Sequence, residues 1–263
     1  MTRKFRVILM GLIACAGISF AGVSCMQYIS SSTGSYIDMS TLELVQTQEP
    51  ENGDPIATIK TSLGDIKVVL YPEYAPNAVK NFTDLAESGY YDNTYVFNSE
   101  PGVYFGAGSP NKNGDLNKDN EQAALEYEQE LHQNLWPFKG ALCSLTTSEE
   151  GGFWKKFKGE SKILNGSRFA VLNSVEFTED LKKELLESDK NTTLAEAFIE
   201  YGGCPSLSQK ITVFGQTYEG FDVIDKLTSL EITDSEDGTK IPVEDIMIET
   251  IEIGTYSSKS DLK

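Results

Sequence analysis

Residues 56–89 read IATIKTSLGDIKVVLYPEYAPNAVKNFTDLAESG, and this stretch determines the kind of domain that the chain can form. Two runs rich in β-branched residues, 56–61 and 65–71, are separated by a short turn, which is the pattern of a β-hairpin. Pro76 suits the first turn of a following helix, because its missing N–H would have no partner there. Gly89 ends that helix in the usual C-terminal position. The stretch therefore predicts two antiparallel strands followed by one helix.

The rest of the chain continues in short strands with few helices. Strand-like runs, separated by Gly, Pro and polar residues, occur at 95–97, 103–105, 139–145, 168–172, 211–214 and 246–253. Residues 221–227 predict a second helix, opened by Gly220. This pattern predicts a mainly β fold, a closed antiparallel barrel with helical caps.

Two stretches are additions to that plan. Residues 178–186 and 194–201 have helical spacing, the first of them behind a Thr cap, so we expect a helical insertion at about 175–203. Residues 151–157 combine aromatic and basic side chains. They predict a loop that packs on the barrel, with a binding surface as the alternative.

The composition is that of a folded, acidic protein. Of 263 residues, 40% are hydrophobic and 24% are charged, which is ordinary for a globular domain. Acidic residues number 40 against 22 basic ones, for a formal net charge of −18. Because such a chain repels nucleic-acid phosphate, we exclude nucleic acid as a partner. The only histidine, His132, has no companion motif for a metal site or for a Ser–His or Cys–His nucleophile.

The N-terminus predicts export. Basic residues precede an apolar run in residues 1–24, which is the shape of a signal peptide. Gly22-Val23-Ser24-Cys25 is similar to a bacterial lipobox, so we expect Cys25 to be acylated and to anchor the protein outside the cytoplasmic membrane. An uncleaved anchor helix and ordinary cleavage are the alternatives.

The expected domain boundaries follow from composition. Residues 25–54 are rich in Ser, Thr, Gln and Glu and predict a flexible tether. The folded domain is expected at 55–254, with a tail at 255–263. Two further cysteines, Cys143 and Cys204, leave open a disulfide, which an exported protein permits, or two buried thiols.

An ordered set of short motifs then spans the domain: Gly64-Asp65-Ile66, Ala75-Pro76-x-x-Val79-x-Asn81-Phe82, Gly89-Tyr90-Tyr91-Asp92-Asn93-Thr94, Pro101-Gly102, Gly106-Ala107-Gly108-Ser109-Pro110, Asn165-Gly166-Ser167-Arg168-Phe169, Val213-Phe214-Gly215 and Gly220-Phe221-Asp222-Val223-Ile224. In their order and spacing these motifs resemble the cyclophilins, which isomerise peptidyl-prolyl bonds. The resemblance implies a closed eight-stranded antiparallel barrel. It also implies proline-containing exported polypeptides as partners, a monomer, and no cofactor or metal.

The resemblance also identifies the site and its departures. Cyclophilins donate hydrogen bonds to the substrate amide from an arginine, and Asn98 stands at that position here. The substrate groove would be lined by Val103, Tyr104, Gly106, Leu145, Ala170, Ser206, Leu207 and Ile211. Val103 and Ala170 replace aromatic residues and so remove apolar surface. Loss of one preorganised donor costs on the order of 10²–10³ in rate.

We therefore expect a cyclophilin-type isomerase of reduced activity, with a non-catalytic peptide-binding or scaffold lipoprotein as the alternative. A solute-binding lipoprotein would need two α/β lobes, which the strand-rich pattern does not predict. Arg168 lies two positions before Ala170 on one expected strand and therefore shares its face. It is expected either to supply a substitute donor or to pair with a surface carboxylate.

Acylation of Cys25 gives the first testable prediction. A labelled fatty acid should be incorporated into the wild-type chain and lost in Cys25→Ser, because the acyl group is carried on that cysteine. Cys15→Ser is the matched control and should keep the label. Label that persists in Cys25→Ser would contradict the lipobox assignment.

Overall fold

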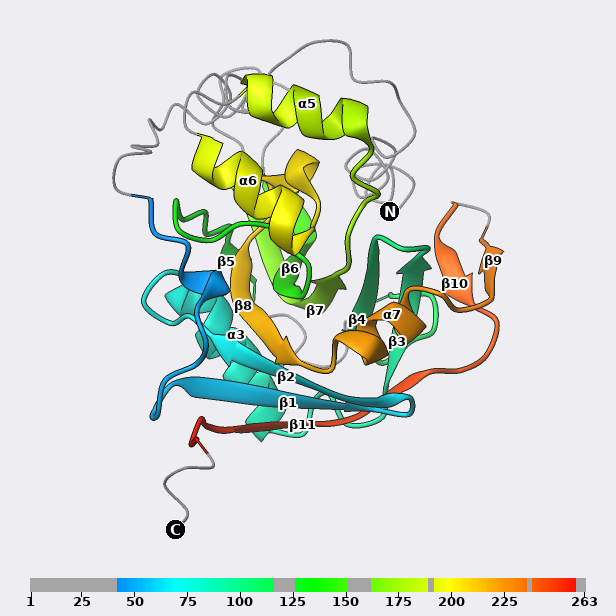
Figure 1. Ribbon diagram of the computed structural model, residues 1–263. Helices are drawn as coiled ribbons and strands as arrows, with labels where there is room; N and C mark the ends of the chain where they lie inside the picture. The colour runs from blue at the N-terminus through cyan, green and yellow to red at the C-terminus, as the bar shows by residue number, and fades with distance from the viewer. Residues whose placement is uncertain (1–41, 116–125, 151–161, 189–191, 236–237, 259–263) are drawn as a thin grey trace.

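The computed structural model describes residues 42–115, 126–150, 162–188, 192–235 and 238–258, and the expected hairpin begins its main sheet (Figure 1). Strand β1 (Pro55–Thr61) pairs with β2 (Gly64–Leu70) in antiparallel register, from Ile56 opposite Val69 to Thr61 opposite Gly64. The other edge of β1 pairs with the last strand, β11 (Met247–Thr255). The two ends of the domain therefore lie side by side.

The remaining strands close this sheet on itself. They are β3 (Thr94–Glu100), β4 (Tyr104–Ser109), β5 (Tyr127–Glu128), β6 (Ala141–Glu150), β7 (Lys162–Leu172) and β8 (Val213–Glu219). The order is β4-β3-β11-β1-β2-β8-β6-β7, and a further pairing of β7 with β4 completes a barrel of eight antiparallel strands, with β5 added beside β7. A separate ribbon pairs β9 (Ile232–Asp234) with β10 (Lys240–Pro242). The expected closed eight-stranded barrel is confirmed.

Two helices cap the barrel, as expected. They are α3 (Pro76–Glu87) and α7 (Phe221–Leu227). From α3, Phe82 packs its ring against Tyr91, Phe169 and Phe214, with centroids 5.3–5.6 Å apart. The core thus joins the helix to the barrel interior, where aromatic contacts of this kind stabilise a fold beyond their buried area.

The insertion consists of the two predicted helices, α5 (Glu179–Ser188) and α6 (Thr192–Tyr201), which lie together on one side of the barrel (Figure 1). The Thr178 hydroxyl accepts a hydrogen bond from the N–H of Leu181 at 3.3 Å, in the manner of the expected cap. A second apolar cluster holds α6 against the chain before β6, and its buried members are Trp136, Phe138, Leu194, Ala197 and Phe198.

The tether prediction is wrong for residues 42–54. A short 3-10 helix, η3 (Val45–Thr47), packs on the domain, and Gln46 within it is only 6% exposed. The Gln46 amide accepts from the N–H of Trp136 at 2.5 Å and donates to the Trp136 carbonyl at 2.9 Å and to Gln216 Oε1 at 2.9 Å. A glutamine amide offers the same donor and acceptor as a peptide group, so it satisfies the Trp136 backbone as a strand would.

The tail prediction is also wrong at its start. Strand β11 includes Thr255, and the next residue, Tyr256, exchanges backbone hydrogen bonds with Gly53 and Asp54. The ordered domain is therefore longer at both ends than composition indicated. The composition of a segment does not reveal that it pairs with residues at the other end of the chain.

Three sequence assignments lie outside the described residues: the signal segment 1–24, the acylated Cys25 and the aromatic–basic loop 151–157. Within the ranges that the structure does describe, there is no helix with the length and apolar character to cross a membrane.

The buried amide gives a prediction about stability. Gln46→Ala should lower the free energy of unfolding by roughly 1–3 kcal/mol, because it removes the acceptor of the Trp136 N–H and one donor each from the Trp136 carbonyl and Gln216 Oε1. Urea denaturation measures this loss. Gln48→Ala, at an exposed position two residues away, is the matched control and should change stability by less than about 0.5 kcal/mol. Equal stability of the two variants would show that η3 does not hold to the domain in solution.

Candidate functional site

Four strands bring small and polar residues into one row. Asn98 of β3 is opposite Gly106 of β4, Gly106 is opposite Ala170 of β7, and Ala170 is opposite Cys143 of β6. Residues directly opposite in an antiparallel ladder share a face of the sheet. The structure therefore places Asn98, Gly106 and Ala170 side by side, as the expected groove requires.

Asn98 is bonded to Tyr104. Its Nδ2 donates to the Tyr104 hydroxyl at 2.5 Å, and both side chains are 4% exposed. Tyr104 lies two positions before Gly106 on β4, so its side chain is on the same face of the sheet as the row. Burial raises the pKa of the Tyr104 phenol above its ordinary value. A buried amide–phenol pair therefore lies at this end of the row.

Arg168 lies against Phe97. Its guanidinium carbon is 5.8 Å from the centroid of the Phe97 ring, and it donates to the carbonyl oxygens of Gly114 at 2.8 Å and Thr146 at 3.1 Å. The guanidinium therefore contacts two backbone carbonyls and an aromatic face. A direct part for Arg168 in catalysis stays a prediction.

The apolar positions of the expected groove are close to the row. Leu145 is 5% exposed, and its Cδ1 is 3.5 Å from where a β-carbon on Gly106 would lie. The neighbouring residue of Leu145, Ser144, donates its N–H to the carbonyl of Thr212, which follows Ile211. Ile211, Leu207 and Val103 are half-buried and pack on the barrel core. Ser206 is half-buried in the 3-10 turn η5 (Pro205–Leu207).

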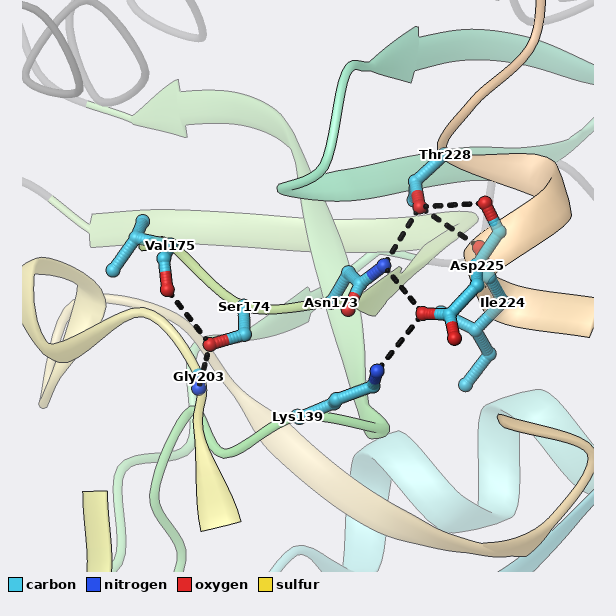
Figure 2. Close-up of polar contacts among 8 residues, drawn as sticks. All are labelled: Lys139, Asn173, Ser174, Val175, Gly203, Ile224, Asp225 and Thr228. Atoms are coloured by element: carbon cyan, nitrogen blue, oxygen red, sulfur yellow. Dashed lines mark hydrogen bonds and ion pairs between the residues drawn. The ribbon is translucent and has the colours of Figure 1, made fainter. Parts of the chain in front are cut away.

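A polar network that the sequence does not reveal joins the end of β7 to the α7 region (Figure 2). The N–H of Asn173, just after β7, donates to the Val103 carbonyl at 2.7 Å. The Asn173 side chain donates to Asp225 at 3.0 Å and to Thr228 at 2.8 Å, and Lys139 pairs with Asp225 at 2.8 Å. The Lys139 hydrogen bond lowers the pKa of Asp225. Through Asn173, therefore, helix α7 fixes the backbone of Val103.

Hydrogen bonds join the two ends of the insertion, which form its base (Figure 2). Ser174 Oγ accepts from the N–H of Gly203 at 2.9 Å and donates to the Val175 carbonyl at 2.9 Å. Gly203 has φ +131°, and a β-carbon there would lie 2.3 Å from the carbonyl oxygen of Pro137, so this position requires glycine. Its neighbour Cys204 has its sulfur 3.9 Å from the Val103 carbonyl. The insertion consequently leads directly into η5 and to Val103, a residue of the expected groove.

Cys143 and Cys204 are both buried free thiols, so the disulfide alternative is not formed. Burial raises the pKa of the Cys143 thiol well above its ordinary value and that of Cys204 to about 12. Because the thiolate is the nucleophile, both cysteines should be unreactive in the folded protein.

This burial gives a prediction about alkylation. In the folded protein at pH 8, iodoacetamide should label Cys143 and Cys204 at least 100-fold more slowly than in urea, an order-of-magnitude expectation from the raised pKa values. Peptide mass spectrometry follows each site. A cysteine introduced at the exposed position of Val243, by Val243→Cys, is the control and should react at the same rate in both states. Rapid labelling of Cys204 in the folded protein would mean that the base of the insertion opens.

Known proteins resemble this chain over most of its length. The family described as cyclophilin type peptidyl-prolyl cis-trans isomerase/CLD matches residues 56–253. A Streptococcus pyogenes protein named as a bifunctional phosphatase/peptidyl-prolyl cis-trans isomerase is 32% identical over 81% of the chain, and the chain spans only 41% of its length. A Staphylococcus aureus protein named as a peptidyl-prolyl cis-trans isomerase is 25% identical over 78% of the chain and 95% of its own length.

A solved structure adds a match of fold. The cyclophilin type peptidyl-prolyl cis-trans isomerase of Cryptosporidium parvum, crystallised in the presence of the dipeptide Ala-Pro, has a TM-score of 0.52 at 22% identity. The match covers 77% of this chain and 99% of that one. With the barrel and the family match in agreement, the chain belongs to the cyclophilin-type peptidyl-prolyl cis-trans isomerase family.

Proposed function

We propose that this cyclophilin domain binds proline-containing segments of exported polypeptides and catalyses their cis–trans isomerisation at a reduced rate. The observation that carries the proposal is the row of Asn98, Gly106 and Ala170 beside the apolar side chain of Leu145. A prolyl ring needs an apolar surface, and the twisted amide needs a hydrogen-bond donor. The half-buried Val103, Leu207 and Ile211 supply further apolar surface around the row.

The reduced rate follows from the chemistry of the donor. Amide resonance sets a barrier of roughly 18–20 kcal/mol to rotation of the peptide bond. A donor that bonds the twisted state more strongly than the planar one lowers this barrier. Hydrogen bonds from a charged guanidinium are about twice as strong as those from a neutral amide. Asn98 is therefore a weaker catalyst than arginine at the same position.

We place the domain outside the cytoplasmic membrane, anchored by lipid on Cys25. The support is the sequence of residues 1–25, with its basic start, apolar run and lipobox-like end. The clients would then be polypeptides that fold after export. The mature domain would act on them as a monomer.

A second candidate is a peptide-binding or scaffold module without catalysis. It is favoured by the burial of Asn98, at 4% exposure, and by the small Ala170 in place of an aromatic wall. Such a module would bind prolyl peptides through Val103, Leu207 and Ile211 without accelerating their rotation.

An isomerisation assay on the double variant Asn98→Arg/Tyr104→Met tests the proposal. This variant restores the family's arginine and removes the phenol that occupies the space next to it. We expect the wild type to accelerate exchange of an Ala-Pro peptide and the variant to exceed it by about 10- to 100-fold. Asn52→Arg, an exposed substitution, is the charge-matched control and should behave as the wild type.

Two results would contradict the catalytic proposal in different ways. Peptide binding without acceleration by either protein would favour the binding module. If neither protein binds the peptide, measured by changes in the NMR spectrum, the groove does not accept proline and both candidates are wrong.

A further inference from the structure

A strained turn follows the short helix η5. The N–H of Lys210 donates to the Leu207 carbonyl at 3.0 Å. Ser208 has φ −52° and ψ 126°, and Gln209 has φ +54°, which are the angles of a type II turn. The residue with positive φ in such a turn is normally glycine or asparagine, because other side chains are strained there. A strained residue persists only where its surroundings hold it, so the contacts of Gln209 are informative.

The side chain of Gln209 ties this turn to a distant part of the chain. Its Nε2 donates to the carbonyl of His132 at 3.0 Å, across 77 residues of sequence. A second amide joins the same two segments in the opposite direction, since Gln129 Nε2 donates to the Lys210 carbonyl at 2.7 Å. Two side-chain amides from different segments therefore hold the turn in place.

The segment at 129–132 is itself fixed to the barrel and its helical cap. The N–H of Gln129 donates to the Ile163 carbonyl of β7 at 2.9 Å. The Glu130 carboxylate accepts from the N–H of Asn77 at 3.1 Å and from that of Ala78 at 2.8 Å, at the start of α3. A hydrogen bond from the turn to this segment therefore fixes the turn relative to the whole barrel.

The turn lies between two residues of the expected groove. Leu207 begins it and Ile211 follows it, and both apolar side chains are half-buried on the barrel core. After Ile211, the carbonyl of Thr212 accepts from the N–H of Ser144 at 2.9 Å, next to Leu145. The geometry of the turn consequently determines where Leu207 and Ile211 lie relative to each other and to Leu145.

We infer that Gln209 is a positioning residue, whose hydrogen bond to His132 keeps Leu207 and Ile211 at the spacing that accepts a prolyl ring. This inference rests on the proposed function and adds a residue that determines its affinity. Gln209 acts through the two apolar side chains and not on the reacting amide. Apolar contact binds the planar and the twisted peptide equally, so loss of Gln209 raises KM and leaves kcat unchanged.

The experiment compares two variants of the full-length chain, with an Ala-Pro peptide as the probe. Gln209→Glu keeps the length of the side chain and removes the donor, because an ionised carboxylate only accepts hydrogen bonds. Gln209→Gly removes the side chain and relieves the strain of positive φ at the same time. In both variants we expect KM, and the Kd from an NMR titration, to rise about fivefold while kcat stays within twofold of the wild type.

Stability separates positioning from a merely structural role. The His132 carbonyl also accepts from the N–H of Leu135 at 3.2 Å, so it keeps a partner in either variant. Relief of strain in Gln209→Gly should offset the lost hydrogen bond, and its midpoint of urea denaturation should equal that of the wild type. Asn93→Gly is the control, because Asn93 also has positive φ, +59°, in an exposed turn before β3. It should leave KM, Kd and kcat unchanged.

The outcomes distinguish this inference from the proposed function. If the wild type binds the peptide and both Gln209 variants bind it equally well, the positioning role is wrong and the proposed function stands. Peptide binding without acceleration, weakened about fivefold in the Gln209 variants alone, supports the positioning role while the catalytic proposal fails. A rise in Kd for Asn93→Gly as well, or a fall in kcat without a change in KM, overturns the inference. If the wild type binds no peptide, the proposed function is wrong and the inference with it.

Discussion

The pairing of β4 with β7 is the constraint on which the rest of the structure depends. It converts an open sheet into a barrel, and it does so through residues 104–107 opposite 169–172. The same residues provide Tyr104, Gly106 and Ala170 of the site. The same strand pairing therefore closes the barrel and builds the site. Strands far apart in the chain must meet in the correct register before Asn98, on the neighbouring β3, can lie beside Gly106 and Ala170. A shift of one residue would turn every side chain of the row to the other face.

Local pattern accounts for much of the architecture but for little of the site. The hairpin at β1–β2, the helices α3 and α7 and both helices of the insertion could be predicted from β-branched runs, Pro76, Gly89 and helical spacing, because neighbours in sequence determine them. The Asn98–Tyr104 bond could not, since β3 and β4 pair with register irregularities between Val96 and Asn98. The burial of Gln46 could not be predicted for a related reason. In a polar segment, no local feature of the sequence distinguishes a buried amide from a solvated one. Its partners are 90 and 170 residues away.

The polar network around Asn173 gives the groove a wall that is held from both sides. Asn173 donates from its backbone to Val103 and from its side chain to Asp225 and Thr228 of the α7 region, and the N–H of Gly102 donates to the Thr228 carbonyl. On the other side, Gly203 and Cys204 bring the end of the insertion to the same backbone. Because both supports consist of buried or half-buried hydrogen bonds, the carbonyl of Val103 has little freedom to move. In the proposed function, a wall fixed in this way would select ligands by shape, which suits prolyl rings, the most rigid of the side chains.

In the proposed function, the rate of isomerisation depends on how a neutral donor performs in a buried setting. A guanidinium keeps its charge everywhere, and its hydrogen bonds are correspondingly strong. An asparagine amide is weaker in water, but hydrogen bonds gain strength where the local dielectric is low, and Asn98 is 4% exposed. The same burial removes most of the entropy cost of orienting the donor, since Tyr104 already contacts it. The weakness of the neutral donor therefore raises the barrier to isomerisation, whereas its preorganisation lowers that barrier. In the proposed function, preorganisation would not replace the missing charge, but it would spare the entropy cost of orienting the donor.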